Sequence, residues 1–150
     1  METAAATMLV EIEVEINAPK ARVWEALTKE MGAWWREDFF ITKKPSKMTI
    51  EPWAGGRMYE ESESGESMLW STVNWVIPGE KLSFISQIWP PFGGPAISMI
   101  TIDLEQHGDT TTLKLSDNLL GKVDEKMRES LDAGWKMLFA DGLKNYVESA

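Results

Sequence analysis

The stretch KVDEKMRESLDAGWKMLFADGLKNYVES, residues 122 to 149, decides the fold that we expect for this chain. A helix turns by about 100° per residue, so side chains three and four positions apart share a face. Six residues share one largely apolar face in this way, and they are Leu131, Trp135, Leu138, Phe139, Gly142 and Tyr146. Such a face must cover other apolar side chains, so we expect one long helix packed on a sheet.

Two features of this predicted helix have both a structural and a functional interpretation. Gly142 lies on the apolar face, where alanine would favour the helix by roughly 1 kcal/mol. The glycine therefore either lets a strand approach closely or keeps a space open beside the helix. Asp124, Arg128 and Asp132 follow one another at four-residue steps. They form either an ion-pair ladder or a site where Arg128 orients an anionic ligand.

The residues before the helix predict six strands joined by short turns. The predicted strands are 47–53, 57–63, 67–77, 81–89, 96–106 and 110–116. Glycine and proline mark the connections, for example AGG at 54–56 and PPFGGP at 90–95. Connections this short cannot hold a crossover, so neighbouring strands should be antiparallel.

The N-terminal part predicts a further strand and two short helices. VEIEVEI (10–16) alternates apolar and acidic residues, as in a strand with one face in water. NAPKARVWEALT (17–28) predicts a short helix that Asn17 caps, and KEMGAWWREDFF (29–40) a second one ending near Trp34 and Trp35. We therefore expect one α+β domain over residues 1–150, with a seven-stranded antiparallel sheet curved around the C-terminal helix.

Composition excludes several classes of function. The formal net charge of -9 repels phosphate, so no nucleic acid partner is expected. The chain has no cysteine, which suits a reducing compartment. METAAATM (1–8) lacks the features of a signal peptide, and no stretch approaches the roughly 20 apolar residues that insert in a membrane, so we expect a cytoplasmic protein. Eight tryptophans and nine methionines suit either an adaptable ligand cavity or a well-filled core.

The order of the elements resembles the helix-grip fold of the SRPBCC, or START-like, superfamily, which includes START domains, the birch-pollen allergen and polyketide cyclases. Five segments resemble more narrowly the bacterial homologues of the activator of the heat-shock-protein-90 ATPase. They are IEVEINAPKARVWEALT (12–28), the Trp34-Trp35 pair, PWAGGRMY (52–59), VIPGEKL (76–82) leading to Trp89, and GWKMLFADGLKNYV (134–147). In this resemblance the two glycines of PWAGGRMY form the turn between the second and third strands.

The resemblance implies an apolar cavity between the helix and the sheet, which in the superfamily holds lipids, sterols, polyketides or plant hormones. Geometry supports a remaining space, because a curved sheet cannot meet a straight helix along its whole length. The candidate ligand-binding residues are Trp35, Trp53, Met58, Trp70, Phe84, Ile100, Ile102, Leu113, Arg128, Trp135, Leu138 and Phe139. Each apolar one among them has core packing as its alternative role.

The sequence predicts no catalytic residue, no metal site and no cofactor. The single histidine, His107, falls in a predicted turn, where a surface role is expected. The acidic run EESESGE (60–66) lacks the spacing of a calcium loop and should form a solvated strand end and turn. Asp103 and Glu105 share the outer side of their strand, opposite Ile102.

Three functions are compatible with this pattern. The first is the binding of a small apolar or amphipathic molecule, which needs no acid, base or nucleophile. The second is a protein-interaction module with a co-chaperone-like role, whose partner is a chaperone or another protein. Such a module should expose an apolar patch and have a collapsed interior. A cyclase- or dehydratase-type enzyme would have to use tyrosine or carboxylates in the pocket. The chain is expected to be a monomer or a homodimer.

Overall fold

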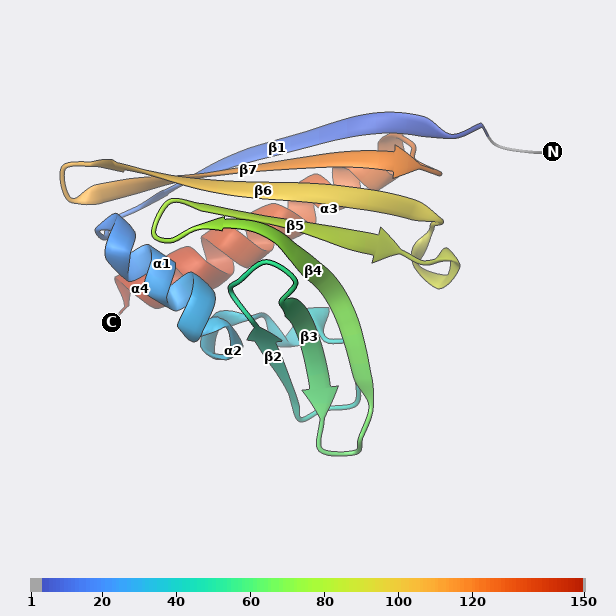
Figure 1. Ribbon diagram of the computed structural model, residues 1–150, viewed down its shortest axis with the longest axis horizontal. Coiled ribbons are helices and arrows are strands. Elements are labelled where there is room, and N and C mark those ends of the chain that lie inside the picture. Colours follow the sequence, from blue (N-terminus) through green and yellow to red (C-terminus); the bar gives the residue numbers. More distant parts are fainter. Residues whose placement is uncertain (1–3, 150) are drawn as a thin grey trace.

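The computed structural model describes residues 4–149, in which seven antiparallel strands form one curved sheet with the helices on one of its faces (Figure 1). The strands are β1 (Ala6–Ile16), β2 (Ser46–Ile50), β3 (Arg57–Ser62), β4 (Ser67–Ile77), β5 (Lys81–Ile88), β6 (Ala96–His107) and β7 (Thr110–Gly121). Their order across the sheet is β1-β7-β6-β5-β4-β3-β2. The predicted helix-grip arrangement of the sheet is therefore confirmed.

Two strands are longer than predicted. β1 begins at Ala6 instead of residue 10, and β7 continues to Gly121 instead of ending at residue 116. The two strands pair along their whole length, from Ala6 opposite Gly121 to Ile16 opposite Thr111. This pairing supplies backbone hydrogen bonds to a segment of β7 whose local sequence, Ser-Asp-Asn at 116–118, favours a turn.

The two short helices after β1 are confirmed as α1 (Lys20–Lys29) and α2 (Met31–Trp34), followed by a single 3₁₀ turn at Glu37–Phe39. The predicted cap at Asn17 is wrong, because α1 begins three residues later and Pro19 holds the capping position. The backbone N–H of Asn17 donates instead to the Glu148 carboxylate, at 2.8 Å. This bond ties the start of α1 to the end of the chain.

The C-terminal helix is continuous from Glu125 to Glu148 but changes its winding. It consists of α3 (Glu125–Lys136), the π-helical segment η3 (Met137–Lys144) and α4 (Asn145–Glu148). Asp124 caps it by accepting a hydrogen bond from the Met127 N–H at 2.8 Å. The wider turn of η3 places Leu143 and Val147 in the core, whereas the predicted Tyr146 is only half-buried.

Two glycine positions have a clear steric cause. A Cβ atom on Gly142 would lie 3.1 Å from the Trp34 carbonyl oxygen, so this glycine permits the close approach of α2, not of a strand. Gly56, in the predicted turn between β2 and β3, has the Glu51 carbonyl 2.0 Å from where a Cβ would lie. Within residues 4–149, no helix has the length and apolar character needed to cross a membrane.

Candidate functional site

Five aromatic rings form a continuous row between the helices and the sheet, which we call the aromatic row. Its members in spatial order are Trp70, Trp35, Trp34, Phe139 and Trp135, and successive ring centroids are 5.6, 6.0, 5.7 and 5.9 Å apart. β4 contributes the first ring, α2 and the residue after it the next two, and the C-terminal helix the last two. These spacings are those of favourable aromatic contacts, so the row joins β4, α2 and the C-terminal helix.

Each end of the aromatic row is bound to a fully buried carboxylate. The Trp70 indole N–H donates to Glu60 on β3 at 2.7 Å. At the other end, the Trp135 indole donates to Asp117 on β7 at 3.0 Å. Both carboxylates therefore point to the helix-covered face and fix the direction of an indole ring.

Glu60 also holds the segment that leads from α2 into β2. Its Oε1 accepts hydrogen bonds from the backbone N–H groups of Ile41, at 2.7 Å, and Thr42, at 2.5 Å. The preceding Phe39 and Phe40 pack against the core. The prediction that EESESGE (60–66) is solvated is thus wrong at Glu60, because three donors replace the water that this buried carboxylate loses.

Asp117 links the sheet to the C-terminal helix. The Ser98 hydroxyl donates to its second oxygen, in addition to the bond from Trp135. Burial raises the pKa of Asp117 above its ordinary value, and the two hydrogen bonds oppose that rise. Both oxygens are engaged, so Asp117 acts here as a positioning residue for Trp135.

Sequence reasoning missed both buried carboxylates, although the alternation contained a signal. Asp117 occupies an inward position between Leu115 and Leu119, and Glu60 follows Met58 by two residues. A charged residue at an inward position of a strand needs a buried partner. The partner indoles lie on other elements, so the strand pattern alone could not name them.

Trp35 differs from the other tryptophans of the aromatic row. Its side chain is only 6% exposed, and its Nε1 has no hydrogen-bond partner among the residues that the structure describes. Trp34, by contrast, donates to the Ala26 carbonyl at 2.8 Å. An unpaired buried donor costs about 1–3 kcal/mol, so this nitrogen requires an explanation.

The structure brings most of the predicted ligand-binding residues together. Ten of them lie in, or pack against, a single core between the sheet and the helices: Trp35, Met58, Trp70, Phe84, Ile100, Ile102, Leu113, Trp135, Leu138 and Phe139. Their contact with a ligand stays a prediction. Trp53 is 58% exposed in the turn after β2 and does not belong to this core.

Arg128 also lies outside the core. Its guanidinium pairs with Glu125 at 3.2 Å and donates to the Leu9 carbonyl. The predicted ladder with Asp124 and Asp132 does not form, because Asp124 caps the helix and Asp132 pairs with Lys136 at 2.8 Å.

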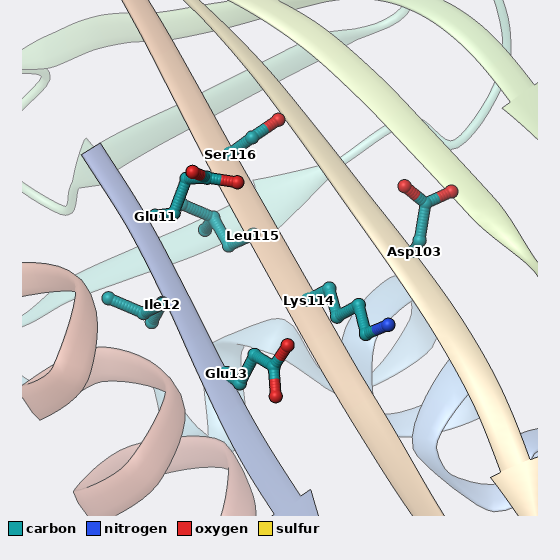
Figure 2. Close-up of a pocket in the computed structure, with 7 residues that line it drawn as sticks. All are labelled: Glu11, Ile12, Glu13, Asp103, Lys114, Leu115 and Ser116. Carbon is teal, nitrogen blue, oxygen red and sulfur yellow. The ribbon is translucent and has the colours of Figure 1, made fainter. Parts of the chain in front are cut away.

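Two hollows stand out, and both are on the surface. One, of about 440 Å³, is lined by Arg36, Glu37, Asp38 and Lys44. The other, of about 280 Å³, lies on the outer face of the sheet, where Figure 2 shows Glu11, Glu13, Asp103, Lys114 and Ser116. Neither hollow lies between the C-terminal helix and the sheet, where the sequence predicted a cavity. The rings of the aromatic row contact one another there instead. His107 is exposed, 3.6 Å from Glu105. Within residues 4–149, no cluster of three or more His, Cys, Asp or Glu side chains fits a metal ion.

Comparison with known proteins reveals both a family and a fold. Residues 17–148 match the family model described as Activator of Hsp90 ATPase homolog 1-like protein. Protein MLL2253 from Mesorhizobium loti is 20% identical, with 95% of this chain and 98% of that chain covered and a TM-score of 0.71. No curated protein matches the chain.

Two further solved structures share the fold. Ara h 8.0201 is 13% identical, with 97% of this chain and 100% of that chain covered and a TM-score of 0.71. DynU16, described as a protein of the dynemicin biosynthetic locus, is 22% identical over 93% of this chain and 47% of its own, with a TM-score of 0.61. At these identities the likeness shows the helix-grip fold alone.

Proposed function

Because the chain belongs to the family of Activator of Hsp90 ATPase homolog 1-like proteins, we propose that it binds a small amphipathic molecule inside its helix-grip fold, without transforming it. The molecule has an apolar body and at least one hydrogen-bond acceptor. It lies between the C-terminal helix and the sheet, against the aromatic row. The lack of cysteine fits a protein that works in a reducing compartment such as the cytoplasm.

The unpaired N–H group of Trp35 carries this proposal. Trp34, Trp70 and Trp135 donate their indole N–H groups to protein oxygens, whereas Trp35 has no acceptor among the described residues although it is as deeply buried as Trp34. A ligand oxygen within about 3 Å of Nε1 would remove the cost of the unpaired donor. The apolar body would then lie on the adjoining rings of Trp35 and Trp70, which are 5.6 Å apart.

The rings contact one another, so a ligand must displace side chains to enter. The segment between α2 and β2 is the best candidate to move, because it belongs to no helix or strand apart from the 3₁₀ turn Glu37–Phe39. To move, it must release the hydrogen bonds from its Ile41 and Thr42 N–H groups to Glu60. The hollow lined by Arg36 and Lys44 lies on the same segment and offers a route from solvent.

The test compares two fluorescent probes of equal size, a naphthyl ketone and the naphthalene hydrocarbon that lacks its oxygen. The native protein should bind the ketone about two- to tenfold more tightly, the range expected for one hydrogen bond. Trp35→Phe keeps an aromatic ring without the N–H and should bind both probes equally. Trp89→Phe, at an exposed tryptophan, is the matched control and should keep the preference.

Two results would overturn this function. Failure of the native protein to take up either probe would exclude an accessible interior. Equal affinity for both probes would exclude Trp35 as the polar contact. Native mass spectrometry of the purified protein, followed by extraction, would identify any molecule that the protein already carries.

The two alternatives, a cyclase-type enzyme and a protein-interaction module, depend on different parts of the molecule. A cyclase- or dehydratase-type reaction needs a free tyrosine or carboxylate in the interior. Asp117 and Glu60 accept hydrogen bonds on both of their oxygens, and the half-buried Tyr146 donates its hydroxyl to Glu30. The outer face of the sheet favours protein interaction. It is separate from the interior, so a partner there would not prevent ligand binding.

A further inference from the structure

The helices cover only one face of the sheet, which leaves the outer face open (Figure 1). This outer face exposes five apolar side chains on four adjacent strands. We call them the outer patch, and they are Leu9, Ile85, Ile97, Met99 and Leu120, which are 38–49% exposed. Single exposed apolar residues are common, whereas a contiguous group on a sheet face indicates an interaction surface.

The strand register makes the outer patch continuous. Ile85 on β5 lies opposite Met99 on β6, and Ile97 on β6 lies opposite Leu120 on β7. Asn118 lies opposite both Met99 and Leu9, and so connects β6 to β1. Directly opposite side chains on one face are about 5 Å apart, so these residues form one surface.

An acidic hollow adjoins the outer patch on the same face. Glu11 follows Leu9 by two residues on β1, and Asp103 follows Met99 by four on β6, so all four side chains point outward. The hollow of about 280 Å³ is lined by Glu11, Glu13 and Asp103, with Lys114 as its single cation (Figure 2).

Two of these carboxylates remain available to a partner. Glu11 and Glu13 form no ion pair with any residue that the structure describes, although they line the hollow. Lys114 is engaged by Glu105 at 3.4 Å, and Asp103 by Lys81 at 3.1 Å. The hollow therefore presents unneutralised negative charge beside an apolar surface.

We infer that the outer patch and the acidic hollow together dock a basic amphipathic segment of another protein. The apolar side chains of that segment pack on the outer patch, and a lysine or arginine enters the hollow toward Glu11 and Glu13. A net charge of -9 attracts such a segment over a distance. A second copy of this chain fits less well, because it would bring another acidic row against the same glutamates.

The test measures fluorescence anisotropy with a short labelled peptide of leucine and lysine, spaced so that a helix has one apolar and one basic face. Two controls are a scrambled peptide of the same composition and a peptide with glutamate in place of lysine. The basic amphipathic peptide should bind most tightly, and its affinity should fall as salt concentration rises. Equal binding of all three peptides would overturn the inference.

Paired variants separate the two parts of the surface. Met99→Ser with Leu120→Ser, and Glu11→Gln with Glu13→Gln, should each weaken binding about fivefold or more. Lys114→Gln should instead strengthen it about twofold, because a competing cation leaves the hollow. Glu63→Gln with Glu66→Gln, on the exposed turn after β3, is the matched control and should change nothing.

Several outcomes would contradict the docking surface. Unchanged peptide binding in both pairs of variants would show that the peptide binds elsewhere. Dimerisation of the native protein in analytical ultracentrifugation, lost in the Met99 and Leu120 variant, would assign the face to a second copy. Trp35→Phe should leave peptide binding unchanged. Failure of the docking inference can therefore be distinguished from failure of the proposed ligand binding in the interior.

Discussion

At the scale of single residues, the two buried carboxylates are the least replaceable polar groups of the interior. Glu60→Ala leaves three donors, the N–H groups of Ile41, Thr42 and Trp70, without an acceptor. We expect a loss of about 2–4 kcal/mol in the free energy of unfolding, measured by urea denaturation. The exposed Glu63, three residues further along the chain, serves as control, and Glu63→Ala should change stability by less than about 0.5 kcal/mol. Equal effects would show that Glu60 does not bind these donors in solution.

The raised pKa of Asp117 predicts that its contribution to folding stability depends on pH with the opposite sign to that of most carboxylates. Its pKa is raised by burial, so the folded state binds this proton more tightly than the unfolded state does. The group therefore favours folding at acid pH, and this contribution is lost as the pH rises from the ordinary value of 3.8 through the raised pKa. A carboxyl titration followed by NMR should place Asp117 above the exposed aspartates. A pKa at or below the ordinary value would contradict its burial.

At the scale of elements, an ion pair within and at the end of α1 is joined to the C-terminal helix by a hydrogen bond. Arg22 on α1 contacts both oxygens of Glu30, at 2.7 and 3.1 Å, and Tyr146 on α4 donates to Glu30 at 2.5 Å. The hydrogen bond from Arg22, followed by that from Tyr146, lowers the pKa of Glu30 to about 2. The side chains are partly exposed, so solvent weakens the interaction.

This ion pair should contribute to stability only above acid pH. Because the pKa of Glu30 is lower in the folded than in the unfolded chain, its contribution is complete above 4.5 and is lost as the pH falls toward about 2. Glu30→Gln should therefore be less stable than the native protein near neutral pH and equally stable near pH 2, by urea denaturation. Glu129→Gln, at an exposed position of α3, should show no such convergence.

The C-terminal helix contains two glycines, and their replacement by alanine should change the free energy of unfolding in opposite directions. At Gly134 an added Cβ meets nothing within 4 Å, so alanine should stabilise the helix by up to about 1 kcal/mol. At Gly142 the Cβ would press on the Trp34 carbonyl at 3.1 Å, and the strain of overpacking, about 1–3 kcal/mol, exceeds that gain. Urea denaturation of both variants measures the difference. A stabilising Gly142→Ala would show that α2 moves freely away from the helix.

At the scale of the whole molecule, periodicity alone predicted most of the inward faces. Alternation placed Ile100, Ile102 and Asp103 on the correct faces, and the helical face was right as far as Gly142. Beyond that glycine the buried positions are Leu143 and Val147, because the π-helical winding of Met137–Lys144 departs from the 100° per residue on which the predicted face was based.

The candidate site was predicted less completely than the fold. Alternation and helical spacing identify apolar residues that face inward, so most predicted contacts lie in one core. The same patterns do not tell which indole meets which carboxylate, because Glu60 and Trp70, or Asp117 and Trp135, come together only through the sheet and the helix. They also did not reveal that Trp53 is left exposed on a turn.

The interior links ligand binding to the stability of the whole molecule. A ligand that binds only the folded state adds about 2.7 kcal/mol to the free energy of unfolding at a hundred times its dissociation constant. For a chain of this length, that should raise the midpoint of thermal unfolding by roughly 5–10 °C. Thermal scans of the native protein with and without the naphthyl ketone measure this shift.

Filling the interior should abolish that shift. Leu138 is buried in the core that Trp135 also packs against, so Leu138→Trp should cost about 1–3 kcal/mol through overpacking and occupy the space that a ligand needs. The midpoint of thermal unfolding of the Leu138→Trp variant should then be lower than that of the native protein, and the ketone should not raise it. Ile85→Trp adds the same bulk on the outer face and should keep the full response. If Leu138→Trp still responds to the ketone, the ligand does not lie between the helix and the sheet, and binding would have to be sought on the surface.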